Sequence, residues 1–164
     1  MHVTIAYLNS EASDSRILHE DSVFERNESL FPDGVTAHAD EDEFKEDIER
    51  IVEWFGDAAA YEDKDGKHKL TIKHDKIRKL FEPYWKEFQE SLQRLHDYTF
   101  DNFVTSRGIA TELDRLNEAF KFDWLYILDD MGVAEPISEW LHDLARSEEP
   151  ESTFYIVATY DGDQ

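Results

Sequence analysis

The chain has 164 residues, and its 39 Asp and Glu against 17 Lys and Arg give a formal net charge of -22 at pH 7. A surface this acidic repels nucleic acid and anionic membranes and attracts basic proteins. We therefore expect a basic protein partner, with no direct nucleic-acid or membrane binding. Because 40% of the residues are hydrophobic and 13% are aromatic, the chain has the core material that disordered acidic tails lack. Its length fits a single acidic domain, residues 1–164.

The chain contains no Cys, which excludes disulfides and thiolate metal sites and removes any need for an oxidising compartment. Its first eight residues lack the basic region of a secretory signal. No stretch approaches the roughly 18 apolar residues of a membrane-spanning helix. We therefore expect a cytoplasmic protein, in the host cytoplasm if a phage encodes it.

Both ends of the chain alternate apolar and polar residues in the manner of β-strands. Residues 2–8 and 154–160 show this pattern, and we predict that the two segments pair in one sheet. Between them, apolar residues at helical spacing follow a run of carboxylates that suits the positive end of a helix dipole. This pattern predicts a helix near residues 41–57.

Two short strands, 58–63 and 67–73, are predicted to form a hairpin across residues 64–66. The Asp-Gly pair in that turn readily adopts the positive φ angles that a tight hairpin requires. The longest periodic run, Ile77 to Leu95, predicts the central core helix. Pro83 lies either at the first residue of this helix or at a kink within it.

The remaining pattern predicts a helix around residues 113–120, a buried strand at 124–128 and a short helix at 136–146. Residues 9–39 have weak periodicity, and we interpret them as an irregular excursion. The predicted fold class is α+β. We expect a single compact domain in which a small, mainly antiparallel sheet, made of the terminal strands and the hairpin, packs against about four helices.

Charge is distributed unevenly along the chain. Residues 40–63 contain 11 acidic and 2 basic residues, whereas residues 64–96 contain 9 basic and 5 acidic ones. The molecule is therefore predicted to be bipolar, and an evenly acidic, salt-adapted surface fits this distribution less well. Pairing of the basic block with the acidic face of a second copy predicts a homodimer. The basic block consists of Lys64, Lys67, Lys69, Lys73, Lys76, Arg78 and Lys79.

Acidic residues of the predicted 41–57 helix form a stripe opposite its apolar face. Like charges at this spacing destabilise a helix by about 0.2–0.5 kcal/mol per pair, so the stripe does not serve helix stability. It is either a solvated face or a binding surface for the basic partner. We take the stripe, the neighbouring Trp54 and a second acidic segment as the candidate binding residues. The stripe is Asp42, Glu46, Glu49 and Glu53, and the second segment is Asp129, Asp130, Glu135, Glu139 and Asp143.

The sequence contains no motif typical of catalysis. It has no Cys nucleophile, no nucleophile elbow and no phosphate-binding glycine loop. Residues 61–72 match a calcium loop only in part, because Tyr61 and Ile72 occupy positions that need Asp and Glu. The His residues lack the spacing of a zinc helix. We therefore expect no cofactor, no bound metal and no enzymatic activity.

Three hypotheses for the function remain. Size, charge and the missing catalytic motifs resemble those of phosphate-mimicking anti-restriction and anti-CRISPR inhibitors of phages and mobile elements, with no shared sequence motif. This resemblance implies a DNA mimic that blocks the nucleic-acid groove of a defence nuclease. The first alternative is an immunity or antitoxin-like protein that neutralises one basic toxin. The second is a carboxylate-rich, metal-dependent enzyme built around Asp123, Asp129 and Asp130.

Overall fold

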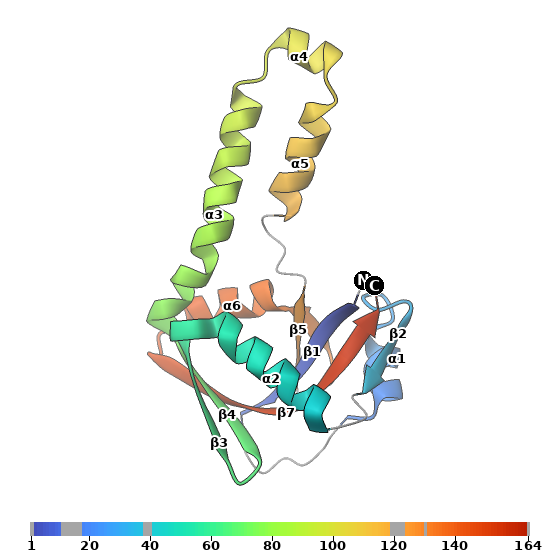
Figure 1. Cartoon of the computed structure of the whole chain (residues 1–164), viewed down its shortest axis with the longest axis vertical. Coiled ribbons are helices and arrows are strands. Elements are labelled where there is room, and N and C mark those ends of the chain that lie inside the picture. Colours follow the sequence, from blue (N-terminus) through green and yellow to red (C-terminus); the bar gives the residue numbers. More distant parts are fainter. Residues whose placement is uncertain (1, 11–17, 38–40, 119–123, 130, 164) are drawn as a thin grey trace.

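The computed structural model of the protein describes residues 2–10, 18–37, 41–118, 124–129 and 131–163. Within these residues, helices pack against a seven-stranded mixed sheet (Figure 1). The strands are β1 (His2–Asn9), β2 (Gly34–Ala37), β3 (Ala59–Lys64), β4 (Lys67–Lys73), β5 (Leu125–Leu128), β6 (Ala134–Pro136) and β7 (Glu151–Asp163). The helices are α1 (Glu20–Asn27), α2 (Glu41–Phe55), α3 (His74–His96), α4 (Phe100–Thr105), α5 (Gly108–Glu118) and α6 (Ile137–Arg146), with a 3-10 turn η1 (Gly56–Ala58) after α2.

Strand β7 is the longest strand and lies at the centre of the sheet. One of its edges pairs with β1, antiparallel, which confirms the predicted pairing of the two terminal segments. Its other edge pairs first with β4 and then with β2. The strand order is β3-β4-β7-β1-β5-β6, and β1 runs parallel to β5. As a result, the two ends of the chain lie side by side (Figure 1).

Helices α2 and α6 and the first turns of α3 cover one face of the sheet. Each presents an apolar face because its hydrophobic residues recur at three- and four-residue spacing. The predicted helix near 41–57 is confirmed as α2, and the helix predicted at 136–146 as α6. The buried cluster joins Ala6, Leu8, Leu70, Ile72, Leu125, Ile127 and Ile156 of the strands with Ile48, Ile51, Phe55, Ile77, Ile137 and Leu141 of the helices.

Residues 18–31 cover the opposite face of the sheet, and β2 follows them as one of its strands. Val23 of α1 and Phe31 are fully buried there against strand residues such as Ile5. The side-chain amide of Asn27 donates to the carbonyls of Val23 at 2.7 Å and Gly132 at 2.9 Å. This segment is therefore an ordered layer of the fold, and its interpretation as an irregular excursion is wrong for the described residues.

The β3–β4 hairpin is confirmed with its predicted turn. Asp65 and Gly66 have φ angles of 55° and 73°, the positive values that a two-residue hairpin turn needs at both central positions. The hairpin register places Tyr61 opposite Leu70 and Asp63 opposite His68. Glycine and aspartate tolerate this backbone better than most residues, so the turn fixes the register.

Helix α3 belongs to the core only at its N-terminal end. Ile77 is fully buried, whereas Trp85 is 57% exposed, because the helix leaves the sheet and projects from it (Figure 1). Helix α5 returns alongside α3, and α4 forms the tip between them (Figure 1). We call α3, α4 and α5 together the helical hairpin. Pro83 lies inside the continuous helix, and the prediction that the whole run is a central core helix is wrong.

The predicted small, mainly antiparallel sheet with about four helices is also wrong. In the described residues the sheet has seven strands and is mixed, and six α-helices accompany it. The difference has a physical cause: β2, β6 and α4 contain only four, three and six residues. Elements this short make no periodic pattern, so tertiary contacts rather than local sequence determine them.

Candidate functional site

Helix α2 carries the predicted acidic stripe. Three acidic residues fill its first turn, where carboxylates interact favourably with the helix dipole. On its inner face, Ile48, Ile51 and Phe55 are at most 2% exposed. Because these residues pack against the sheet, the opposite face of α2 points away from the protein.

Arg50, paired with the buried carboxylate of Asp47 on the same helix, joins α2 to the sheet. The carboxylate of Asp47 lies 2.6 Å from Nη2 of Arg50, and its side chain is only 8% exposed. The same guanidinium donates to the hydroxyl of Thr4 on β1. It also lies over the ring of Trp124, 5.6 Å from the centroid, within the range of cation–π attraction. Arg50 thus connects the helix, the sheet and Trp124, which holds the orientation of the acidic stripe.

All four stripe carboxylates, Asp42, Glu46, Glu49 and Glu53, lie on exposed residues. At a rise of 1.5 Å per residue, the stripe is about 16 Å long. A duplex of that length presents about ten phosphates, since one recurs about every 1.7 Å of axis. The stripe by itself therefore offers fewer than half of the negative charges of the corresponding DNA.

A groove of about 550 Å³ lies between α2 and the β3–β4 hairpin. Its lining combines apolar side chains with carboxylates, two of which belong to the acidic stripe. Such a groove suits a Lys or Arg side chain, whose aliphatic stem packs on apolar surface while its charged end remains near the carboxylates. The apolar lining is Ile48, Val52 and Tyr61, and the carboxylates are Glu49, Glu53 and Asp63.

Tyr61 and His68 form a polar pair within this groove. The Tyr61 hydroxyl and Nδ1 of His68 are 2.8 Å apart and hydrogen-bonded, and the two rings are stacked at an interplanar angle of 3°. Burial raises the pKa of the Tyr61 hydroxyl, and the charges of Asp63 and Glu49 raise it further. The ammonium of Lys45, which also lines the groove, lies 2.9 Å from Glu41. Burial and the charges of Asp63 and Glu49 thus both disfavour an added negative charge beside Tyr61.

Four residues of the second acidic segment lie near one another: Asp129 directly after β5, Glu135 on β6, and Glu139 and Asp143 on α6. Burial raises the pKa of the Glu135 carboxyl, and the nearby charges of Asp143, Glu139 and Asp129 raise it further. The charges of these three carboxylates thus act on Glu135, so the four predicted residues form one acidic region, which we call the acidic cluster. Because α2 and α6 pack on the same face of the sheet, their outer surfaces point to the same side of the molecule. The four cluster carboxylates and the four of the stripe together approach the ten phosphates above.

Asp129 also has a local structural role. Its Oδ1 accepts hydrogen bonds from the backbone N–H groups of Met131 at 2.9 Å and Val133 at 2.8 Å. These bonds close the turn between β5 and β6. One oxygen of the Asp129 carboxylate therefore already accepts two hydrogen bonds within the protein. Asp130 and Asp123 lie outside the described residues.

Trp54 lies at the boundary of the core. Its ring makes edge contacts with Phe55 at 5.0 Å and Trp124 at 5.7 Å between centroids, and it packs against the main buried cluster. These contacts explain its position without a partner, and its role in binding stays a prediction.

Two parts of the site are not predicted from the sequence. Asp47 lies three residues after Phe44, on the apolar face of α2, and this spacing is a signal that its carboxylate is covered. The Tyr61–His68 pair follows from the hairpin register, since the two residues are diagonal neighbours across β3 and β4. The groove itself has no local signal, because it arises from the packing of two separate elements.

The basic block lies along β4 and the first turns of α3, with Lys64 at the end of β3. One of its members, Lys69, lies 3.6 Å from Glu62 across the hairpin. Four of its residues, Lys64, Lys67, Lys69 and Lys73, belong to the hairpin that lines the groove. The homodimer predicted through this block stays a prediction.

Within the part of the chain that the structure describes, no three His, Asp or Glu side chains form a group that could hold a metal ion. In the same ranges, no helix has both the length and the apolar content needed to cross a bilayer. Comparisons with protein-family models, curated proteins and solved structures found no match. Any functional conclusion therefore depends on the geometry and charge of the surface itself.

Proposed function

We propose that this protein binds the basic surface of a nucleic-acid-binding partner, a defence nuclease of the restriction or CRISPR type, and excludes nucleic acid from it. The observation that carries this proposal is the outer face of α2, where four exposed carboxylates form one stripe and two of them also line a groove. Like-charged neighbours on a helix are unfavourable in isolation. A basic partner would relieve that repulsion.

The mechanism is steric competition at a surface that normally binds phosphates. The stripe together with Asp129, Glu135, Glu139 and Asp143 comprises eight acidic residues, close in number to the phosphates of a short DNA segment. A net charge of -22 would steer the protein toward a basic groove and accelerate the encounter at low salt. Once bound, the protein would occupy the positions that the phosphates need.

The groove favours a second candidate, an immunity-type protein that neutralises one basic toxin. Apolar lining accommodates a partner side chain by shape as well as by charge, and a buried central contact of this kind confers specificity that a charged rim lacks. Ile48, Val52 and Tyr61 supply that lining. Both candidates use the same surface and differ in the number of partners.

A competition assay tests the proposal. A type I restriction enzyme, a Cas9–guide RNA complex and a basic toxin nuclease are each bound to fluorescent duplex DNA, and the protein is added in increasing amounts. We expect the wild type to release the DNA from at least one of them. We expect Glu49→Lys with Glu53→Lys to raise the concentration needed by tenfold or more, a change equivalent to about 1.4 kcal/mol.

The matched control reverses two exposed carboxylates outside the site, Glu148→Lys with Glu149→Lys, and changes the net charge equally. Release from several unrelated nucleases supports mimicry, and release from one alone supports the immunity-type candidate. If the control loses as much activity as the α2 variant, only the overall charge matters and the proposal fails. Absence of release from every nuclease at low salt would contradict both candidates.

A further inference from the structure

The helical hairpin collects the exposed apolar side chains of the protein. Among the described residues, eight large hydrophobic side chains are exposed, and six of them lie on this hairpin. Because the hairpin projects away from the sheet (Figure 1), the rest of the fold does not cover them. The six are Trp85 and Leu92 on α3, Phe100, Phe103 and Val104 on α4, and Leu113 on α5.

Leu92 and Leu113 lie on the same side of the hairpin. Ser91 and Glu112 are the buried contact residues between α3 and α5, joined by Arg94, which donates to Ser91 Oγ at 2.8 Å and to Glu112 Oε2 at 2.7 Å. Each leucine follows its contact residue by one position, and is therefore turned from it by about 100°. Since α3 and α5 run antiparallel, the same turn along each chain leads to the same side. We call this side the apolar flank.

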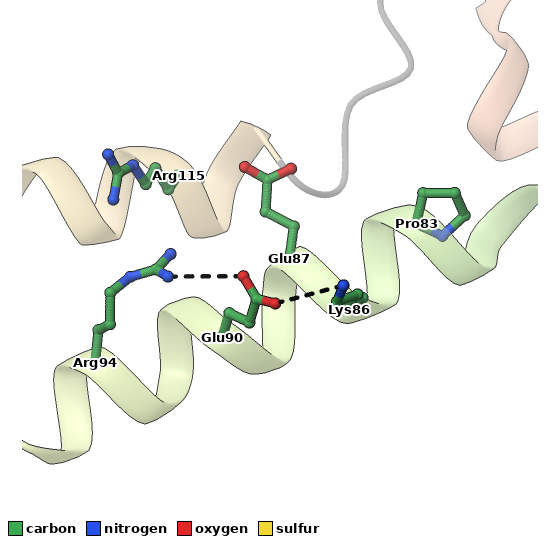
Figure 2. A pocket seen from close by; sticks show the side chains of 6 residues that line it. All are labelled: Pro83, Lys86, Glu87, Glu90, Arg94 and Arg115. Carbon is green, nitrogen blue, oxygen red and sulfur yellow. Dashed lines mark ion pairs between the residues drawn. The ribbon is translucent and has the colours of Figure 1, made fainter.

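The apolar flank is also free of charge. On α3, residues 85, 88, 89 and 92 are Trp, Phe, Gln and Leu, and on α5, residues 109, 110, 113 and 116 are Ile, Ala, Leu and Leu. On another side of the hairpin, five charged residues line a pocket of about 390 Å³ between α3 and α5 (Figure 2). There, Glu90 lies 3.9 Å from Lys86 and 3.8 Å from Arg94 (Figure 2). In a chain with 34% charged residues, this separation gives the hairpin one charged and one uncharged side.

The exposed apolar side chains of the flank and of the α4 tip together have the area of an interface. At the exposed fractions of these six side chains, and with about 150–250 Å² for each aromatic residue, they expose on the order of 700 Å². The largest apolar patch of a typical monomer is about 300–600 Å². A standard interface buries about 800 Å² on each partner. The area therefore matches what one copy contributes to a stable dimer.

The low charge of this surface favours a second copy of the chain over a basic protein as its partner. A basic partner gains nothing from an uncharged flank, whereas a second copy presents an equally uncharged and apolar one. The hairpin, residues 74–118, has nine acidic and seven basic residues, so almost all of the net charge of -22 lies elsewhere in the chain. It is therefore the part through which two such acidic molecules can approach with the least repulsion.

We propose that the apolar flank pairs with the same flank of a second copy of this chain, with the two hairpins antiparallel and related by a two-fold axis. Helices α3 and α5 of the two copies then form a four-helix bundle. Each tip, with Phe100 and Phe103, lies near the Trp85 end of the other copy. The Trp85–His96 segment alone is about 16 Å long. The two acidic sheet regions are thus separated by about two Debye lengths or more at physiological salt. This dimer is independent of the proposed function.

Light scattering and sedimentation test the dimer over a hundredfold range of concentration. We expect the wild type to have twice the chain mass of 19.3 kDa, and Leu113→Glu to be a monomer at the same concentrations. The matched control is Thr111→Glu, which adds the same charge to an exposed position of α5 about 200° away, and it should remain a dimer. Because Leu113 is 53% exposed, its replacement should leave the circular dichroism spectrum unchanged.

Salt and spin labels distinguish this arrangement from others. A dimer held by the apolar flank persists or strengthens as salt rises, whereas a dimer held by the Lys64–Lys79 block dissociates. Since the chain has no Cys, a single label at Asp101→Cys marks each tip. We expect the two labels to lie at opposite ends of the bundle. A monomeric wild type, equal disruption by Thr111→Glu, dissociation by salt, or a short distance between tips would each overturn the proposal.

Discussion

Gly162 on β7 lies against Phe31, and its replacement by Ala tests how residues 18–31 pack on the sheet. A Cβ at this position would lie 2.8 Å from Cδ1 and 3.0 Å from Cε1 of Phe31, and 3.1 Å from Cδ1 of Ile5. Phe31 is fully buried, and its ring meets that of Tyr126 at 5.1 Å, edge to face. The phenyl ring therefore cannot move into solvent, and the added methyl group must displace packed atoms.

We expect Gly162→Ala to lower the free energy of unfolding by about 1–3 kcal/mol, the usual cost of one extra methyl group in a full core. For a chain of this size, each kcal/mol lowers the melting temperature by about 2–4 °C. Urea denaturation followed by far-ultraviolet circular dichroism measures the change. The variant Phe31→Leu serves as the partner in a double-mutant cycle, because its side chain is smaller and more adaptable at the same place.

The double variant Gly162→Ala with Phe31→Leu should cost less than the sum of the two single variants, by about 0.5–3 kcal/mol. This coupling is the signature of direct contact between positions 31 and 162. Additive effects, or a Gly162→Ala protein within about 0.5 kcal/mol of the wild type, would refute the packing of this segment on the sheet.

Three other substitutions probe individual interactions. Asp47→Ala should lower the unfolding free energy by about 1–3 kcal/mol in urea, because it removes a charge-assisted bond at 2.6 Å while the half-exposed Arg50 keeps its access to water. The raised carboxyl pKa of Glu135 means that the folded state holds this proton more tightly than the unfolded state, so stability falls as the pH rises above about 4.5. Glu135→Gln should therefore stabilise the protein more at about pH 7.5 than at about pH 5, measured as shifts of the urea midpoint. Tyr160→Phe should lower the unfolding free energy by about 1 kcal/mol, because a hydrogen-bonding hydroxyl is lost. It should also remove the tyrosine whose pKa burial raises to about 12, and an alkaline ultraviolet titration detects this loss.

Each of these results has a contradicting outcome. An Asp47→Ala protein as stable as the wild type would show that the ion pair does not fix α2. Glu148→Gln, at an exposed position outside the acidic cluster, is the control for Glu135→Gln, and an equal pH-dependent gain there would disprove the effect of the cluster. An unchanged alkaline titration after Tyr160→Phe would show that the buried hydroxyl is a different one.

The elements that the sequence predicts correctly are those with local causes. Helix α2 follows from apolar residues at helical spacing after a run of carboxylates, and the β3–β4 hairpin follows from Asp65-Gly66 in its turn. The outward direction of the acidic stripe follows as well, since a helix that buries Ile48 and Ile51 must expose the opposite side.

The elements that sequence reasoning misses depend on distant contacts. The position of α1 depends on Asn27, whose side chain bonds to Gly132 and Ala134, more than a hundred residues away. In α3, the apolar period predicts one covered stripe, but the structure covers only part of it. Ile77 packs in the main buried cluster, whereas Trp85 of the same period is 57% exposed. The groove beside α2 likewise depends on the packing of the β3–β4 hairpin, which no local pattern specifies.

The central claim is that the acidic face of α2 meets a basic, phosphate-binding surface, and the salt dependence of the dissociation constant tests it most directly. The measurement compares the wild type, Glu49→Lys with Glu53→Lys, and Glu148→Lys with Glu149→Lys on a nuclease that the protein inhibits. We predict a steep rise of Kd with salt for the wild type, a weaker Kd and a shallower slope for the α2 variant, and a nearly unchanged slope for the control. Equal slopes and equal losses of affinity for both variants would contradict the claim.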